Sequence, residues 1–243
     1  MPAPGPVTRE QLSRFGREWK QGMHVLVTGP TGSGKTALAR HVLEQHIMRG
    51  GFSCVLVGKL GEDKTITNDY SARDGWIRWT RWPKRGPKVF ENKILLWPNT
   101  DRVKSVRAKR ALQREVFEDA FDRLANIGHW TIQIDEGLYT TSPEFMNLGN
   151  HVAMLHQMGR SSNLSLLTLA QRPSHLPLVV YSSASHAFTG RANQLVDRKR
   201  LAELGTTIDT KDLMDRIGRL GRHEFLWTPV VSGADPEIVD LIR

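Results

Sequence analysis

The feature that most constrains this chain is a run of eight residues, GPTGSGKT, at positions 29–36. A short apolar run, 23–28 (MHVLVT), precedes it, and the stretch 37–49 after it carries apolar residues at helical spacing. The run fits the pattern Gly-x-x-x-x-Gly-Lys-Thr without departure, between a predicted buried strand and a predicted helix. This is the context of a phosphate-binding loop, so the sequence predicts a nucleotide-binding α/β fold.

The residue types explain how this loop would hold phosphate. Its glycines permit backbone conformations closed to other residues, so that successive N–H groups can point into one concavity beside the positive end of a helix. We expect Lys35 to reach the β- and γ-phosphates and the Thr36 hydroxyl to ligate Mg²⁺. The predicted nucleotide-binding residues are Gly29, Pro30, Thr31, Gly32, Ser33, Gly34, Lys35 and Thr36.

Two further strands end in polar residues suited to the same chemistry. The run 130–136 (WTIQIDE) ends in Asp135, a candidate Mg²⁺ ligand, and Glu136, a candidate base for an attacking water. The run 164–170 (LSLLTLA) is followed by Gln171, which could bind the γ-phosphate or that water. An ordinary acidic loop and a capping amide in a turn are the alternatives. The carboxyl ends of strands in open α/β sheets are where ligands bind, which favours the functional interpretation.

Apolar runs alternate with helical patterns along the whole chain. Five to seven short strands of this kind predict a mostly parallel sheet covered by helices on both faces. Residues 1–7 are expected to form a flexible arm, and the helix at 9–20 could pack on the core or on a neighbouring subunit. The residues 58–70 read as irregular. The remaining predicted strands are 53–57, 93–97, 186–191 and 223–228, and the remaining predicted helices are 103–127, 143–159, 194–204, 209–219 and 236–243.

The net charge of +9 is concentrated in one stretch. Residues 73–110 hold twelve Lys or Arg and three Asp or Glu, whereas the rest of the chain holds twenty-two of each. A local excess of this kind favours a polyanion partner, with nucleic acid first among the candidates.

Tryptophan and arginine alternate within that stretch, at 74–89, in a predicted hairpin or loop excursion. Such side chains can stack on bases and bind a phosphate backbone. Alternatively, the tryptophans form a small local core while the charges are solvated. The candidate nucleic-acid contacts are Arg78, Trp79, Arg81, Lys84 and Arg85.

Other patterns exclude several classes of protein. No apolar stretch approaches the length of a membrane span, and the first residues lack the pattern of a signal peptide. The single cysteine, Cys54, excludes an intrachain disulfide, which fits a reducing, cytoplasmic setting. The nine histidines lack metal-ligand spacing, and no serine has a nucleophile-elbow pattern.

The ordered motifs GPTGSGKT, TIQIDE and LLTLAQRPS resemble those of the FtsK–HerA superfamily of ring-forming DNA-pumping ATPases, especially the short packaging ATPases of viruses. The resemblance covers residues 23–191 and implies a RecA-like core over residues 21–243, with an arm and short helix at 1–20 and the basic segment at about 73–90 as an insertion. It also implies an arginine that reaches a neighbour's nucleotide. Arg160 occupies that place, with Arg172 and Arg191 as rivals. The turn at 58–61 (GKLG) departs from the Asp-Pro-Lys-like turn of many relatives.

The resulting hypothesis is an ATP- and Mg²⁺-dependent motor that moves double-stranded DNA through a hexameric or pentameric ring into a viral capsid. Its partners would then include a capsid or portal vertex, and its location would be the host cytoplasm or the virion. A P-loop nucleotide or small-molecule kinase is one alternative. An assembly protein switched by ATP without moving DNA is another.

Overall fold

The computed structural model describes residues 9–85, 88, 91–204 and 208–241, so the arm predicted at 1–7 lies outside it. The strands are β1 (His24–Thr28), β2 (Phe52–Leu56), β3 (Ile77–Trp79), β4 (Lys93–Leu96), β5 (Trp130–Ile134), β6 (Ser165–Ala170), β7 (Ala184–Gly190), β8 (Glu224–Thr228) and β9 (Glu237–Asp240). The helices are α1 (Arg9–Glu18), α2 (Lys35–Ile47), α3 (Lys64–Asp69), α4 (Val106–Ile127), α5 (Gly137–Thr141), α6 (Gly149–Met158), α7 (Leu178–Ser182), α8 (Leu195–Ala202) and α9 (Thr210–Arg219).

The described strands form one nine-stranded sheet in the order β3-β4-β2-β5-β6-β1-β7-β8-β9. Every pair from β3 to β7 in that order is parallel, and β8 and β9 add antiparallel strands at one edge. This confirms the predicted α/β class with a mostly parallel sheet. The order places β6 between β1 and β5, which brings the three polar strand ends together.

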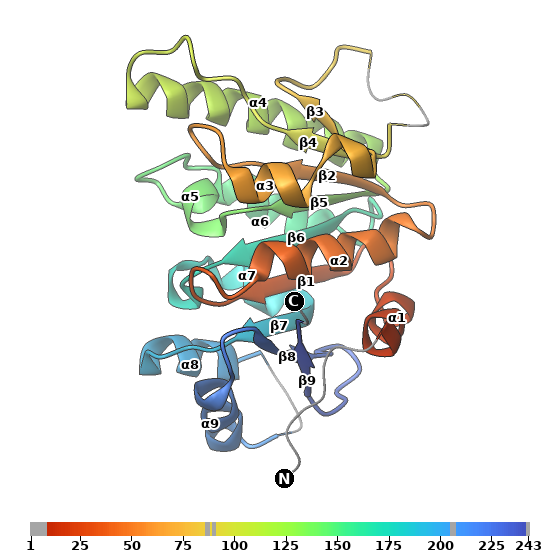
Figure 1. The fold of residues 1–243 in the computed structure, drawn as a ribbon, viewed down its shortest axis with the longest axis vertical. Coiled ribbons are helices and arrows are strands. Elements are labelled where there is room, and N and C mark those ends of the chain that lie inside the picture. The colour runs from red at the N-terminus through yellow and green to blue at the C-terminus, as the bar shows by residue number, and fades with distance from the viewer. Residues whose placement is uncertain (1–8, 86–87, 89–90, 205–207, 242–243) are drawn as a thin grey trace.

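Helices cover both faces of the sheet, as predicted (Figure 1). In β1 the side chains of Val25 and Val27 pack with α1, α2 and α3, whereas Leu26 packs with the cluster that contains α4 and α6. Because strand side chains alternate between faces, fully apolar strands are those buried on both sides. Burial in β2 includes Cys54 and raises the pKa of its thiol well above the ordinary value.

Helix α1 belongs to this core. Phe15 and Trp19 are 1% and 0% exposed, and the Phe15 ring meets Phe188 of β7 at 5.1 Å between centroids. Of the two places that the sequence allowed for this helix, the structure selects the core of the same chain.

The predicted helix 143–159 is wrong in its first half. The chain forms the short helix α5 and then reverses at Asn147, which has a left-handed φ of 54°, before α6 begins. The N–H of Leu148 donates to the carbonyl of Thr140 and closes this reversal. Phe145 and Met158, which the apolar spacing of that predicted helix places on its buried face, are 36% and 38% exposed. Pro143 and the apolar spacing suggested one continuous helix, and neither signalled the turn.

The predicted C-terminal helix at 236–243 is also wrong, since residues 237–240 form β9 and 242–243 lie outside the described part. The β-branched pair Ile238 and Val239 pairs with β8, where Val239 lies opposite Phe225 and is 2% exposed. The edge of β8 supplies a partner that a single-sequence pattern does not reveal.

Two segments before α4 are more regular than expected. Residues 64–69, read as irregular, form α3, whose first N–H groups donate to the Asp63 carboxylate. Of the hairpin or loop excursion predicted at 74–89, the described residues fit the loop excursion. β3 is a parallel edge strand beside β4, and no described strand pairs with it in antiparallel fashion. Residues 86–87 and 89–90 of that segment lie outside the described residues.

Candidate nucleotide-binding and catalytic site

The glycine-rich loop connects β1 to α2 at the edge where the parallel strands end, on the left in Figure 1. Gly32 and Gly34 have φ of 75° and 96°, the left-handed region that glycine adopts at no steric cost. Lys35 and Thr36 form the first turn of α2, which has 13 residues. The loop and helix N-terminus therefore have the geometry that binds anions.

The residues Thr31, Gln171 and Glu136 form a chain of hydrogen bonds across three neighbouring strands. The Thr31 hydroxyl donates to the Gln171 side-chain oxygen at 3.0 Å. The Gln171 amide nitrogen donates in turn to the Glu136 carboxylate at 3.1 Å. Gln171 can make both contacts because β6 lies between β1 and β5. The structure thus brings together the ends of all three sequence motifs.

The cleft beside this chain has a volume of about 420 Å³. Its lining includes Lys35, Thr36, Asp135, Glu136 and Gln171, all of which the sequence had singled out. The other lining residues are Thr31, Gly32, Gly34, Ala37, Lys59, Asp63, Thr65, Ile66, Asp69 and His223.

The two carboxyl groups in the cleft have raised pKa values. Burial raises the pKa of Asp135 to about 6, against the opposing influence of Lys59, and Asp135 is 8% exposed. Burial also raises the pKa of Glu136, while the hydrogen bond from Gln171 and the charges of Lys59 and Lys35 lower it. A buried carboxylate in a cleft beside cations is suited to hold a metal ion or to accept a proton.

Lys35 folds back over the loop, where its ammonium donates to the Pro30 carbonyl at 2.9 Å. Burial lowers its pKa, whereas the charges of Glu136 and Asp135 raise it. The cation is therefore held inside the cleft and next to the acidic pair. Phosphate oxygens would replace the carbonyl as its partner.

Sequence reasoning missed several residues of the cleft, among them Lys59, Asp63 and His223. Lys59 and Asp63 lie on the connection after β2, which was read as irregular, and His223 lies just before β8. The ring of His223 is 3.1 Å from the Ser33 carbonyl, so β8 supports the loop from the side opposite β6. The only available signal was the position of residues 58–61 at the end of a strand, which places them at the ligand edge.

Arg160 lies on the opposite side of the molecule from the nucleotide cleft, at the end of the sheet where the parallel strands begin. It follows α6 and lines a pocket of about 360 Å³ with Gly22 and His24, which lie at the start of β1. Its side chain is exposed. Arg160 therefore does not share a cleft with Lys35 of its own chain.

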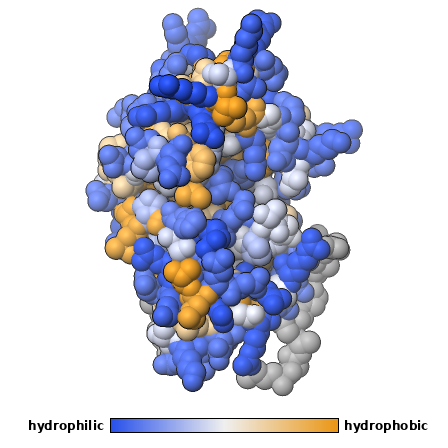
Figure 2. Space-filling model, turned by 90° about the vertical axis from the view of Figure 1, so that its left-hand side faces the viewer, coloured by the Kyte–Doolittle hydropathy of each residue, from blue (hydrophilic) through white to orange (hydrophobic). Residues whose placement is uncertain are grey.

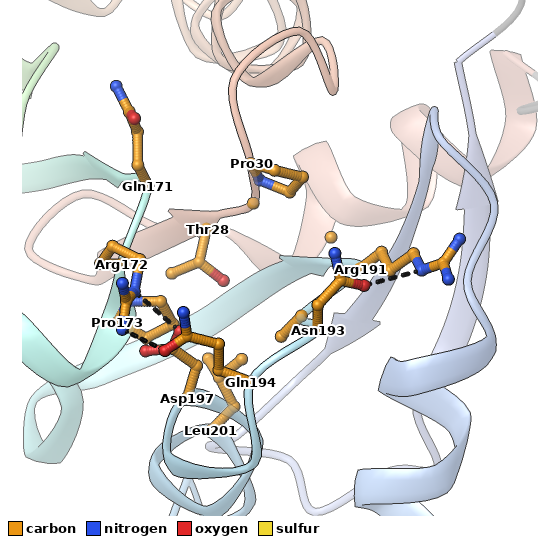
Figure 3. A pocket seen from close by; sticks show the side chains of 13 residues that line it. Thr28, Pro30, Gln171, Arg172, Pro173, Arg191, Asn193, Gln194, Asp197 and Leu201 are labelled. Atoms are coloured by element: carbon orange, nitrogen blue, oxygen red, sulfur yellow. Dashed lines mark hydrogen bonds and ion pairs between the residues drawn. The ribbon is translucent and has the colours of Figure 1, made fainter.

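The rivals Arg172 and Arg191 lie at the nucleotide edge, around a smaller pocket of about 140 Å³ (Figure 3). Arg172 donates to the buried Asp197 at 2.9 Å and to Gln194 at 2.6 Å, so its guanidinium is committed to α8. Arg191 is exposed, bonds Asn193 at 3.1 Å, and points away from Gln171 in Figure 3.

The tryptophans between positions 74 and 89 pack into the protein. Trp76 and Trp82 are 3% and 5% exposed and lie in the clusters on opposite faces of the sheet. Trp79 is partly buried, with its ring 5.2 Å from that of Trp82 in a T-shaped contact. These tryptophans therefore belong to the cores on the two faces of the sheet, and not to one small local core.

The cations of the same segment are exposed. Arg78 pairs with Glu62 at 2.8 Å and lies over the Trp97 ring, and Arg81 pairs with Glu115 at 3.2 Å. Lys84 and Arg85 are exposed as well, and within the described residues no carboxylate is within ion-pair distance of either.

A mostly parallel sheet with this loop, an acidic strand end and a polar strand end between them defines a P-loop NTPase fold. No protein-family model matches the chain, and no curated protein sequence matches it either. Solved structures do match.

The genome packaging NTPase B204 from Sulfolobus turreted icosahedral virus 2, in complex with sulfate, has a TM-score of 0.66 and 15% identity over 93% of this chain and 99% of that one. The same NTPase has also been solved in complex with AMPPCP. VirB4 of Thermoanaerobacter pseudethanolicus has a TM-score of 0.65 and 11% identity, covering 90% of this chain and 89% of that one.

The monomer form of the pCW3 conjugation coupling protein TcpA, with ATPγS, has a TM-score of 0.55 and 16% identity over 90% of this chain and 60% of that one. At such low identity these likenesses show the fold. The chain has the fold of FtsK–HerA-like P-loop ATPases, as the motifs had suggested. Within the described parts of the chain no helix is long and apolar enough to span a membrane.

Proposed function

We propose that this protein hydrolyses ATP as a subunit of a ring that moves double-stranded DNA. The observation that carries the hydrolytic part is the hydrogen-bonded chain from Thr31 through Gln171 to Glu136 beside Lys35. It joins the phosphate loop to a carboxylate that can accept a proton from water. The likeness to B204, the DNA-packaging ATPase from Sulfolobus turreted icosahedral virus, supports the DNA part.

In the proposed reaction, Lys35 and the loop hold the triphosphate, and Gln171 and Glu136 orient a water molecule against the γ-phosphorus. The water oxygen bonds to that phosphorus, the bond to the ADP oxygen breaks, and the water proton passes to Glu136. Positioning and charge compensation supply most of the catalysis in such reactions.

Thr36 and Asp135 would hold a Mg²⁺ ion, whose chemistry when bound is to neutralise charge on the β- and γ-phosphates. Both line the cleft with Lys35, and oxygen donors are the ligands that Mg²⁺ prefers. Among the described residues no group of three or more His, Cys, Asp or Glu side chains could hold a metal alone. The remaining ligands would therefore be nucleotide oxygens and water.

Arg160 favours a ring of subunits in head-to-tail contact. In such a contact, the side of one subunit where the parallel strands end faces the side of the next subunit where they begin. The contacts close into a ring when the rotation between neighbouring subunits permits it. Arg160 is exposed on the side where the strands begin, so it would enter the neighbour's nucleotide cleft. Four apolar side chains in the first turns of helices on the side where the strands end are more than half exposed, as a subunit contact requires: Val106 (54%), Leu178 (59%), Leu195 (51%) and Val196 (53%).

Figure 2 shows this side facing the viewer, mostly hydrophilic with separate small apolar patches. A surface that combines polar and apolar side chains in this way is typical of subunit contacts that form and rearrange during a catalytic cycle. The exposed cations Lys84 and Arg85, together with Arg102 and Lys104 ahead of α4, are the proposed contacts to DNA phosphates. Arg78 and Arg81 remain candidates that would have to exchange Glu62 and Glu115 for phosphate.

The test is the ATPase rate of protein of known oligomeric state, with and without long double-stranded DNA. We expect hydrolysis to be stimulated by DNA in the oligomer and to fall as salt rises, because phosphate contacts release counterions. Lys84→Ala with Arg85→Ala should reduce the stimulation, whereas the matched pair Lys199→Ala with Lys211→Ala should not. A monomer that hydrolyses ATP at the same rate with or without DNA would contradict the motor.

A further inference from the structure

Lys59 lies in the nucleotide cleft, and the reaction proposed above gives it no role. It follows β2, which is next to β5, and it lines the same cleft as Lys35, Thr36 and the acidic pair. The side chain is half-buried. The charge of Lys59 lowers the pKa of Asp135 more than the charge of Lys35 does.

The backbone at Gly58 explains how Lys59 comes so close to the acidic pair. A Cβ placed on Gly58 would lie 3.1 Å from a ring carbon of Tyr139 and 3.8 Å from Cβ of Glu136. A side chain at position 58 would press on the Tyr139 ring, whereas its distance to Glu136 would be an ordinary van der Waals contact. The loop is therefore packed directly on the residue proposed to activate water.

Two buried side chains hold the loop in this place. The Gln113 amide nitrogen donates to the Lys59 carbonyl at 2.7 Å, and the Thr100 hydroxyl donates to the Leu60 carbonyl at 2.7 Å. Gln113 is 0% exposed and Thr100 is 3% exposed. The Tyr139 hydroxyl donates to the Gln113 side-chain oxygen at 2.9 Å, which fixes the orientation of that amide.

From this arrangement we propose that Lys59 is a catalytic residue that contacts the γ-phosphate of bound ATP, and that Gln113 and Tyr139 position it. The proposal rests on the ATPase function proposed above and adds a second cation, from the same subunit, to the one supplied by Lys35. Its ammonium would face the phosphate from the β2 side of the cleft, whereas Lys35 faces it from the loop.

Such a cation stabilises charge that develops on the equatorial oxygens of the transferred phosphoryl group. It also favours ATP over ADP, because only ATP has the γ-phosphate. A lysine serving only as counter-ion to Asp135 and Glu136 would have no such preference. The ratio of the two affinities therefore separates the two roles.

The first experiment measures binding of fluorescent ATP and ADP analogues to the wild type and to Lys59→Met, without turnover. We expect the variant to lose about tenfold in ATP affinity while ADP affinity stays within about twofold, as for one lost charge-assisted contact. Lys64→Met is the control, because its exposed lysine begins α3 and does not line the cleft. An unchanged ratio of ATP to ADP affinity in Lys59→Met would overturn the proposal.

The second experiment measures kcat and KM. Lys59→Met should lower kcat about 100-fold, the size of effect seen when one transition-state donor is lost, and Lys59→Arg should restore part of it. Tyr139→Phe keeps the ring that packs on Gly58 but removes the hydroxyl, so kcat should fall several-fold at constant KM and constant melting temperature. Gln113→Leu should give the larger loss of the two positioning variants.

A wild type that binds ATP but does not hydrolyse it would contradict the proposed function and leave the affinity ratio as the test of Lys59. A wild type that hydrolyses ATP, together with a fully active Lys59→Met, would contradict the Lys59 proposal alone. The two failures are therefore distinguishable.

Discussion

At the scale of single residues, the site combines ionisable groups whose charged forms are disfavoured by burial. Asp135 is buried with a raised pKa, and Lys35 is half-buried with a lowered one. Each has little solvent and depends on neighbours that a nucleotide and a metal ion would complete. Such sites favour binding at the expense of the stability of the free protein.

The raised pKa of Asp135 predicts how the stability of the free protein depends on pH. Between about pH 4 and pH 6 the folded protein keeps the Asp135 proton while the unfolded chain loses it, so the free energy of unfolding falls as the pH rises. Asp135→Asn removes this effect. We expect the variant without nucleotide to be more stable than the wild type at pH 8, by on the order of 1–3 kcal/mol, and no more stable at pH 4.

Urea unfolding of both proteins at the two pH values, without nucleotide or metal, measures this difference. The comparison between variant and wild type cancels the other titrating groups. Equal stability at pH 8 would show that Asp135 is solvated well enough to carry its charge without cost.

At the scale of elements, the sequence predicted what depends on local pattern. The strands around the loop, the acidic strand and the strand before Gln171 were placed correctly, because each is an apolar run bounded by turn residues. The helix α4 was also placed correctly to within three residues at its start, where Ser105 caps it. These elements carry most of the site.

The failures depend on contacts between distant segments. The tail at 237–240 is a strand because β8 offers it an edge, and β3 is parallel because β4 lies beside it. Lys59 was missed because its role depends on Gln113, which lies 54 positions away along the chain. Neither periodicity nor composition contains such information.

The segment 77–82, which includes β3, allows the contribution of side-chain packing to stability to be compared with that of an exposed ion pair. Trp82 is buried, with its ring 5.6 Å from that of Trp130 in a T-shaped contact, whereas Arg81 pairs with Glu115 and both side chains are more than 60% exposed. Trp82→Ala should cost about 3–5 kcal/mol of unfolding free energy, and Arg81→Ala under about 1 kcal/mol. Chemical denaturation measures both; similar costs would contradict the packing described here.

At the scale of the whole molecule, the nucleotide cleft and Arg160 lie at opposite edges of the sheet. A ring would bring the two together between neighbouring subunits. The cleft of one chain then stays incomplete without the next chain, which would link hydrolysis to assembly.

Mixing two inactive variants tests this arrangement. Arg160→Ala subunits keep Glu136, and Glu136→Gln subunits keep Arg160, so each variant alone should be nearly inactive. A random equal mixture should recover about a quarter of the wild-type ATPase rate, because about one interface in four joins an intact cleft to an intact arginine. The same mixture made with Arg172→Ala or Arg191→Ala serves as the comparison. Failure of the Arg160 mixture to recover would locate the arginine elsewhere.

The position of β1 between β6 and β7 also determines when the site can form during synthesis. Val25 pairs with Leu167 on one side and with His186 on the other. A nascent chain that has emerged only as far as α4 therefore holds β1 with neither neighbour in the sheet. Contacts of such long sequence separation form slowly, and unpaired strand edges are exposed until then. The nucleotide-binding loop is translated before β6 and β7, so β1 has both of its neighbouring strands only after residue 190 has left the ribosome.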